Sequence, residues 1–176
     1  MFRMIKSLGP TKIRYSGLWG HWGGTQYCGG APYKGHAVSF KLRVEPSQGS
    51  GDDTSLNAIC LSCSGGDQIC SKVGPWGNWY GLSTAPCPGG FGGFKFRFEG
   101  SQGSGDDTAA NNVHLRCNGS GHWKGTTAPN LWGSWSGPYY CPSGYVICGL
   151  RTRVENPIDG DDTALNGVEF TCCKAL

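Results

Sequence analysis

The chain has 176 residues, which suits one domain, and its 15 Lys and Arg against 12 Asp and Glu give a formal net charge of +3. Its 31 glycines and 10 prolines indicate frequent turns, while 12% aromatic residues exceed what a disordered chain carries. Arg3, Lys6, Lys12 and Arg14 precede every acid of the chain. The remainder is therefore nearly neutral and offers no large basic surface for nucleic acid.

Residues 1–12 are predicted to be a basic N-terminal arm, and residues 13–176 a single domain. Met1–Pro10 lacks the apolar core of a signal peptide, and no run of about 20 apolar residues predicts a transmembrane segment. We therefore expect a chain whose leader has been removed. The arm is predicted to be a flexible tail, and binding to acidic glycans or to a membrane surface is the alternative.

Three motifs recur in every third of the domain, which divides it into repeats of residues 13–66, 67–121 and 122–176. The motif Trp-Gly-x-Trp starts at Trp19, Trp76 and Trp132; Arg-x-Glu ends at Glu45, Glu99 and Glu155; Asp-Asp-Thr-x-x-Asn starts at Asp52, Asp106 and Asp161. Since the motifs keep the same order in all three units, we expect three copies of one structural unit.

Polar and apolar residues alternate in two segments of each unit, which predicts half-buried β-strands. These segments are residues 41–45 and 58–63, 95–99 and 112–117, and 151–155 and 167–172. Another strand is expected around each Trp-Gly-x-Trp motif and one before it, at residues 12–15, 68–73 and 123–127, which makes about twelve strands. No segment has the apolar stripe of a helix. The last unit lacks a strand at its end, so the N-terminal strand is predicted to complete its sheet.

Ten cysteines, an even number, indicate an oxidising compartment and five disulfides rather than a zinc site. The repeat predicts the pairs Cys28–Cys63, Cys87–Cys117 and Cys141–Cys172. The remaining four cysteines are expected to pair as Cys60–Cys70 and Cys148–Cys173, although Cys172 and Cys173 could exchange partners.

The repeated Trp-Gly-x-Trp and Gly-Asp-Asp-Thr motifs, with the segments Val44–Gln48 and Cys172–Lys174, resemble the vitelline membrane outer layer protein family over roughly Ile13–Lys174. The resemblance implies a β-prism of three four-stranded antiparallel sheets with pseudo-threefold symmetry, whereas spacing alone would also allow a β-trefoil. It also implies a place in an egg layer or another secretion, and a proposed sugar-related role that includes oligosaccharide transfer. The chain departs from the family pattern in its basic arm, in Cys60 and Cys70, and in the glycine run 89–93.

The repeated acids, together with one tryptophan outside the repeats, are the candidate glycan contacts: Glu45, Asp52, Glu99, Asp106, Glu155, Asp161 and Trp123. Glycoside chemistry needs two carboxyl groups in different environments, and a threefold repeat supplies three equivalent ones. We therefore expect these acids to be mainly structural, with Asp binding backbone N–H groups in turns and Glu pairing with Arg. A calcium site on paired Asp is the alternative; no catalytic residue, metal ligand or cofactor is assigned.

The motif tryptophans are expected in the core or half-buried, which leaves Trp123 as the candidate for an exposed stacking residue. The four histidines are expected to be solvated. Asn118-Gly-Ser is an N-glycosylation sequon.

Two functions remain open. The first is a secreted structural or interaction protein of an extracellular coat, egg layer or mucus-type secretion, with coat glycoproteins or glycans as partners. The second is a carbohydrate-active protein, either a lectin-like binder or a weak oligosaccharide transferase. Specific activity is expected where the repeats differ: the arm 1–12 and residues 89–93, 118–123 and 156–159.

Overall fold

The computed structural model describes residues 9–17, 19–30, 33–46, 55–99, 110–129, 132–156 and 165–175. Within these ranges the chain forms fourteen β-strands and no helix. The strands are β1 (Thr11–Ser16), β2 (His21–Trp22), β3 (Gln26–Tyr27), β4 (Ala37–Val44), β5 (Leu56–Cys63), β6 (Gln68–Cys70), β7 (Asn78–Tyr80), β8 (Phe91–Phe98), β9 (Ala110–Cys117), β10 (Trp123–Lys124), β11 (Ser134–Trp135), β12 (Tyr139–Tyr140), β13 (Tyr145–Val154) and β14 (Leu165–Lys174). The described part of the chain therefore contains no helix long and apolar enough to span a membrane.

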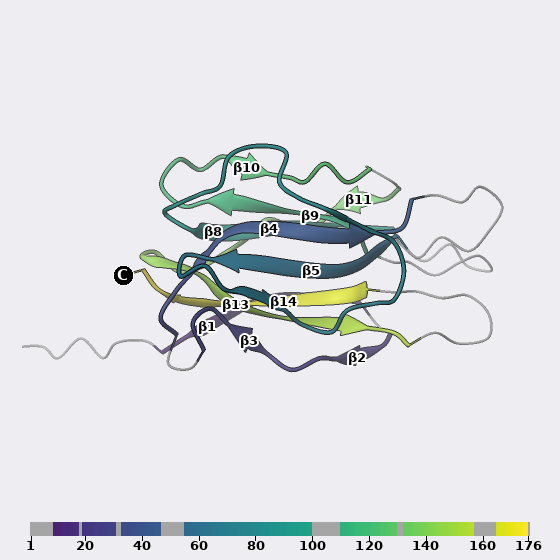
Figure 1. Cartoon of the computed structure of the whole chain (residues 1–176), viewed down its shortest axis with the longest axis horizontal. Helices are drawn as coiled ribbons and strands as arrows, with labels where there is room; N and C mark the ends of the chain where they lie inside the picture. The colour runs from purple at the N-terminus through teal and green to yellow at the C-terminus, as the bar shows by residue number, and fades with distance from the viewer. Residues whose placement is uncertain are drawn as a thin grey trace, which may run out of the picture.

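The strands form three antiparallel sheets, each built on one pair of long strands (Figure 1). In the first sheet β6 and β7 flank the pair β5–β4, and in the second β10 flanks β9 while β11 and β12 flank β8. In the third sheet β1 flanks β14, while β2 and β3 flank β13. Three sheets were expected, and three are present.

The outer strands are shorter than expected, and in two sheets the strand around the Trp-Gly-x-Trp motif is broken in two. Gly23 and Gly24 lie between β2 and β3, and Gly137 and Pro138 lie between β11 and β12. Glycine weakens a strand, and proline cannot donate a ladder hydrogen bond. The structure therefore has fourteen strands rather than about twelve.

The outer strands of each sheet come from the next repeat along the chain. Strands β6 and β7 of the second repeat flank the long pair of the first, and β10 to β12 of the third flank the pair of the second. The circle closes because β1 pairs with β14 over the whole of Thr11–Ser16. This confirms that the N-terminal strand completes the C-terminal sheet, and it places Thr11 and Lys12 in a strand rather than in an arm. One repeat in sequence is therefore not one sheet.

The core lies between the inner faces of the three sheets. Apolar residues at alternate positions of the long strands are fully buried, including Phe94, Phe96 and Phe170. The rings of Phe94 and Phe170 meet edge to face at 5.0 Å, so the second and third sheets are in contact. Tyr15 of β1 packs against Phe96 at 4.8 Å and joins the N-terminal strand to the same core.

Each long pair contains a β-bulge at the asparagine of the repeated motif. Between Arg43 and Val44 the pairing partner changes from Ala58 to Leu56, which skips Asn57. The same shift skips Asn111 in the second sheet and Asn166 in the third. All three asparagines are buried. A bulge bends and twists its strand, so the motif asparagine shapes the same end of every sheet.

All ten cysteines form disulfides: Cys28–Cys63, Cys60–Cys70, Cys87–Cys117, Cys141–Cys172 and Cys148–Cys173. These are the pairs expected from the sequence, and Cys172 and Cys173 keep the partners first assigned to them.

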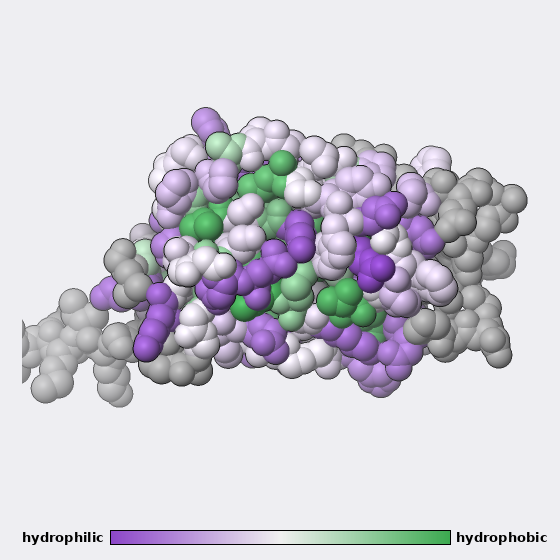
Figure 2. All heavy atoms as spheres, viewed as in Figure 1, coloured by the Kyte–Doolittle hydropathy of each residue, from purple (hydrophilic) through white to green (hydrophobic). Residues whose placement is uncertain are grey.

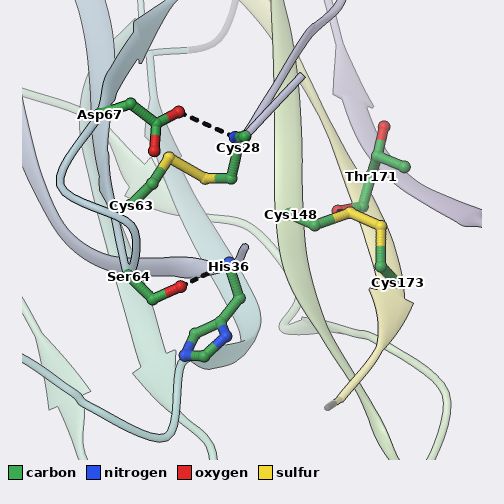
Figure 3. The surroundings of a disulfide bond; sticks show 9 residues. Cys28, His36, Cys63, Ser64, Asp67, Cys148, Thr171 and Cys173 are labelled. Carbon is green, nitrogen blue, oxygen red and sulfur yellow. Dashed lines mark hydrogen bonds between the residues drawn. A yellow bond between two sulfur atoms is a disulfide. The ribbon is translucent and has the colours of Figure 1, made fainter. Parts of the chain in front are cut away.

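Three of the bridges connect different sheets. The loops after β3, β7 and β12 supply one cysteine each, and these bridge to β5, β9 and β14 of the neighbouring sheet. The other two bridges join paired strands within one sheet. Figure 3 shows the inter-sheet bridge Cys28–Cys63 beside the intra-sheet bridge Cys148–Cys173. The backbone N–H of Cys28 also donates to the Cys148 carbonyl at 2.8 Å. The three inter-sheet bridges therefore form a closed ring around the three sheets.

Candidate functional site

The Trp-Gly-x-Trp turns lie at one end of the molecule, against the ends of β4, β8 and β13. Figure 1 shows β2 and β11 at the end where β4 finishes. The turn glycines Gly20, Gly77 and Gly133 have φ of 81°, 88° and 91°. A Cβ at Gly77 would lie 2.4 Å from the backbone of Val44, and one at Gly133 would lie 2.2 Å from the Phe98 carbonyl oxygen. Only glycine fits this close approach.

An arginine of the neighbouring repeat holds each turn. The Nε–H groups of Arg43, Arg97 and Arg153 donate to the carbonyls of Gly77, Gly133 and Gly20, at 3.1, 3.0 and 2.9 Å. In two turns the Nη1 of the same arginine also donates to a glycine three residues earlier: Arg43 to Gly74 at 3.0 Å, and Arg153 to Gly17 at 2.7 Å. The repeated arginine therefore anchors the turn, and its pairing with the nearby Glu stays a prediction.

The bulge asparagines hold the chain that leads into these turns. The carbonyl of Asn57 accepts from the Gly74 N–H at 2.7 Å, and that of Asn166 accepts from the Gly17 N–H at 2.7 Å. The Asn57 side chain also accepts from the Trp76 N–H at 3.3 Å. Arginine and glycine thus hold the turn in each corner of the prism end, and in two of the three corners the asparagine also holds the chain that leads into the turn.

The first tryptophan of each turn is exposed. Relative exposure is 50% for Trp19, 47% for Trp76 and 59% for Trp132. The expectation of core or half-buried packing is wrong for these three residues. The physical reason is that the glycine beside each of them packs directly on the strand end, which leaves the indole on the solvent side.

The second tryptophan of each turn lies next to a cation on the outer face of its sheet. The distances from the cation to the ring centroid are 4.6 Å for Lys41 and Trp79, 4.6 Å for Lys95 and Trp135, and 4.8 Å for Arg151 and Trp22. Trp22 and Trp135 are half-buried as expected, whereas Trp79 is 41% exposed. These cation–π contacts fix the second indole on its sheet.

The predicted acidic candidates divide into two groups. Asp52, Asp106 and Asp161 lie outside the described residues. Glu45, Glu99 and Glu155 directly follow β4, β8 and β13, which belong to three different sheets; Glu45 is buried and the other two are partly buried. In each corner the turn glycine packs against the backbone of the Glu, next to the exposed tryptophan. A Cβ at Gly77, for example, would lie 2.5 Å from the backbone nitrogen of Glu45. The structure does not bring the three glutamates to one sheet.

Trp123, the predicted stacking residue, lies in β10 at the edge of the second sheet and is only partly exposed. The ammonium of Lys95 lies between two indoles, 5.2 Å from the Trp123 centroid and 4.6 Å from that of Trp135. The better exposed indoles are the first tryptophans of the repeated turns, which were expected in the core or half-buried.

His114 is not the solvated histidine expected from the sequence. Its ring lies 4.4 Å from the Trp135 ring, and it pairs with Lys95 across the second sheet. Burial, with the charges of Lys95 and Arg97, lowers the pKa of His114 to about 4. The polar–apolar alternation of residues 112–117 could have indicated this position, because it places His114 on the outer face of a strand.

Glu169 was also missed. This carboxylate is buried on the outer face of the third sheet, where Lys12 Nζ lies at 2.8 Å, Arg151 Nε at 2.9 Å and Arg14 Nη1 at 4.0 Å. Burial would raise the pKa of Glu169, but Arg151 and Lys12 hold it below its ordinary value. Glu169 pairs with Arg14 on one neighbouring strand and with Arg151 on the other. This strand pairing is the feature that would have indicated the ion-pair cluster.

The remaining predicted features are simple to place. Asn118 is exposed in the turn after β9, so its sequon is accessible, and glycosylation stays a prediction. No group of three His, Cys, Asp or Glu residues suited to a metal ion occurs among the described residues. The calcium alternative concerned the paired aspartates, which lie outside that part of the chain.

Fold and site together define a disulfide-stapled β-prism protein with a threefold set of exposed tryptophan turns. The model of the vitelline membrane outer layer protein I family matches residues 10–175, and the chain belongs to this family. It is 38% identical to the human vitelline membrane outer layer protein 1 homolog over 178 residues, which covers 93% of this chain and 82% of the relative. The mouse homolog is 37% identical over 175 residues with the same coverage.

Solved structures share the fold at low sequence identity. A mannose-binding lectin from Champedak superposes with a TM-score of 0.56 at 10% identity, covering 95% of this chain and 99% of the lectin. An artocarpin–mannopentose complex gives a TM-score of 0.56 at 9% identity, covering 94% of this chain and 99% of that one. The Vibrio cholerae biofilm matrix protein Bap1 gives 0.54 at 11% identity, covering 96% of this chain but 24% of Bap1. The fold is therefore a β-prism, as the resemblance implied, and not a β-trefoil.

Proposed function

We propose that the protein is a secreted structural or interaction protein of an extracellular coat or mucus-type secretion, and that it contacts glycans at the prism end. The observation that carries this proposal is the exposure of Trp19, Trp76 and Trp132 on three rigid turns. An exposed indole offers a large apolar face and one N–H donor, which suits the apolar face and hydroxyl rim of a sugar ring. Because an arginine holds each of the three turns, binding costs little ordering of the protein.

The bridges and the surface support an extracellular role. Five disulfides, three of which join the sheets in a ring, suit an oxidising compartment. Figure 2 shows hydrophilic and hydrophobic residues interspersed over the face that carries β4 and β5. The names of the relatives refer to the outer layer of the vitelline membrane, and the names of the structural neighbours refer to mannose binding and a biofilm matrix.

A glycan array tests the binding part of the proposal. The wild type is expected to bind at least one neutral glycan, and the triple variant Trp19→Ala, Trp76→Ala, Trp132→Ala to lose that signal. Each single variant is expected to weaken binding by about tenfold, a common cost of truncating an aromatic contact.

The matched control is Tyr140→Ala. Tyr140 is 50% exposed, like the turn tryptophans, but it lies in β12 outside the repeated motif. This variant should bind the neutral glycan of the array as the wild type does. An array without signal, or a folded triple variant with full binding, contradicts the proposal.

The alternative is a carbohydrate-active protein, either a lectin-like binder or a weak oligosaccharide transferase, and the transferase is the part that differs most from the role proposed above. Glycoside chemistry needs two carboxyl groups flanking one bond, whereas Glu45, Glu99 and Glu155 follow strands of three different sheets. Incubation with chitooligosaccharides followed by chain-length analysis separates the two functions. Changed chain lengths would replace the structural role with a catalytic one.

A further inference from the structure

The outer face of the second sheet differs in its charge from that of the third sheet, where Glu169 gathers three cations. Strands β8 to β12 contribute four cations and no Asp or Glu, and the nearest acid in the chain is Glu99, directly after β8. Lys95 and Arg97 alternate with the buried Phe94 and Phe96, so both cations point away from the core. Arg116 lies on the same face, because it alternates with buried residues of β9.

Aromatic rings lie between these cations. Lys95 lies between Trp123 and Trp135, and Arg97 lies 6.0 Å from the centroid of Trp135. Arg116 pairs with Trp123 across the strands and lies 5.5 Å from the centroid of the exposed Tyr140. The face therefore alternates positive charge with ring surfaces along its length.

The residue paired with the central cation differs among the three sheets, and only the third sheet has a carboxylate there. Each sheet has a cation at the same position of one long strand: Lys41 in the first, Lys95 in the second and Arg151 in the third. In the third sheet this cation pairs with Glu169, and in the first sheet it pairs with Cys60. Glu169 gathers three cations, and Cys60 is bridged to Cys70. In the second sheet the equivalent residue is His114, which is neutral at pH 7 because its pKa is lowered to about 4.

We propose that the outer face of the second sheet binds anionic oligosaccharides that carry sulfate or carboxylate groups. Lys95, Arg97 and Arg116 would pair with the anionic groups, since guanidinium groups match carboxylate and sulfate oxygens in geometry. The indole and phenol faces of Trp123, Trp135 and Tyr140 would contact the apolar faces of the sugar rings. This surface adjoins the Trp132 turn, because Arg97 and Trp135 belong to both, but it does not include the exposed indoles of the prism end.

Single-stranded nucleic acid also binds cations interleaved with aromatic rings. The five disulfides favour an extracellular polyanion over nucleic acid. The experiment therefore includes an oligonucleotide as a competing probe.

Isothermal titration calorimetry with a heparin-derived hexasaccharide in about 0.15 M salt tests the proposal. The variant Lys95→Gln, Arg116→Gln is expected to lose at least tenfold in affinity, and its salt dependence should be weaker because fewer charge contacts form. The control is Lys41→Gln, the equivalent cation of the first sheet, which should stay within twofold of the wild type. If the double variant fails to fold, Arg116→Gln alone should still lose about threefold.

Three results would overturn the proposal. The first is no binding of the hexasaccharide by the wild type, and the second is an equal loss in Lys41→Gln. The third is tighter binding of a single-stranded oligonucleotide than of the hexasaccharide at matched charge. The triple tryptophan variant of the prism end should keep its hexasaccharide affinity, so this proposal and the proposed function fail independently.

Discussion

At the scale of single residues, the turn glycines are the positions least able to accept a side chain. Gly77 has φ of 88°, and a Cβ there would lie 2.4 Å from the backbone of Val44. We expect Gly77→Ala to lower the free energy of unfolding by about 2–3 kcal/mol, the cost of a strained backbone and a forced shift. Gly81→Ala is the control, because a Cβ at Gly81 meets no atom within 4 Å. Thermal melts of both variants give the comparison, and equal melting temperatures would contradict this role.

Glu169 makes stability depend on pH. Because the fold holds the pKa of this carboxyl below 4.5, the ionised form stabilises the folded state at neutral pH. We expect Glu169→Gln to cost about 2 kcal/mol at pH 7, the usual order for a hydrogen-bonded buried charge. As the pH falls through the folded-state pKa, the wild type loses this contribution, so the two melting temperatures should converge. A difference that stays constant from pH 7 to pH 3 would contradict the role of the charge.

The residue scale is also where the sequence was least informative. Strand alternation places Trp19, Trp76 and Trp132 near a strand, but it cannot tell whether an indole beside a turn faces the core or the solvent. Their exposure depends on the contact between each turn glycine and a strand of another repeat, which lies far away in the chain. The partners of Glu169 lie on two other strands, β1 and β13, and Lys12 is more than 150 residues from it in the sequence, beyond the reach of local patterns.

At the scale of elements, strand β1 closes the third sheet. Its six residues pair with β14, and without them β14 would become an exposed edge. We expect deletion of residues 1–16 to give aggregated or unfolded protein, whereas deletion of residues 1–8 leaves β1 intact and should leave the melting temperature unchanged. Size-exclusion chromatography and circular dichroism measure both. A monomeric, folded protein without residues 1–16 would contradict the closure.

The disulfides differ in what they connect. Cys28–Cys63 joins two sheets across 35 residues, and Cys60–Cys70 joins two paired strands across 10. Chain entropy predicts a loss of about 4 kcal/mol on replacing the first pair by alanine and about 3 kcal/mol for the second. Urea unfolding of the two double variants measures the difference. A larger loss for Cys60–Cys70 would show that the inter-sheet ring is not the stronger constraint.

At the scale of the whole molecule, the repeat made most of the fold predictable. Period-two alternation located the long strands, and the shared order of motifs gave the disulfides and the closure by β1. Apart from that closure, neither signal says which strands are neighbours, so the exchange of the other outer strands between repeats appeared only in the structure. The fold name depended on the family resemblance, because spacing alone also allowed a β-trefoil.

Function at this scale follows from what the repeats share and where they differ. The shared residues build three corners, each presenting a tryptophan, while His114 in place of Glu169 leaves the cations of the second sheet without the carboxylate that the third sheet has. This difference lies within a strand, whereas specific activity was expected in the arm 1–12 and in residues 89–93, 118–123 and 156–159; residues 1–8 and 157–159 lie outside the described part of the chain, and that expectation stays a prediction. Trp123, at the end of the segment 118–123, is the one part of that expectation that belongs to the proposed surface.

The most direct test of the account observes the indole N–H signals of the seven tryptophans by NMR during titration with the strongest neutral glycan of the array. The account predicts that the signals of Trp19, Trp76 and Trp132 shift together with binding, while those of the half-buried Trp22 and Trp135 stay in place. Shifts confined to the half-buried indoles, or no shift at saturating glycan, would contradict the claim that the repeated turns form the glycan-contacting end of the prism.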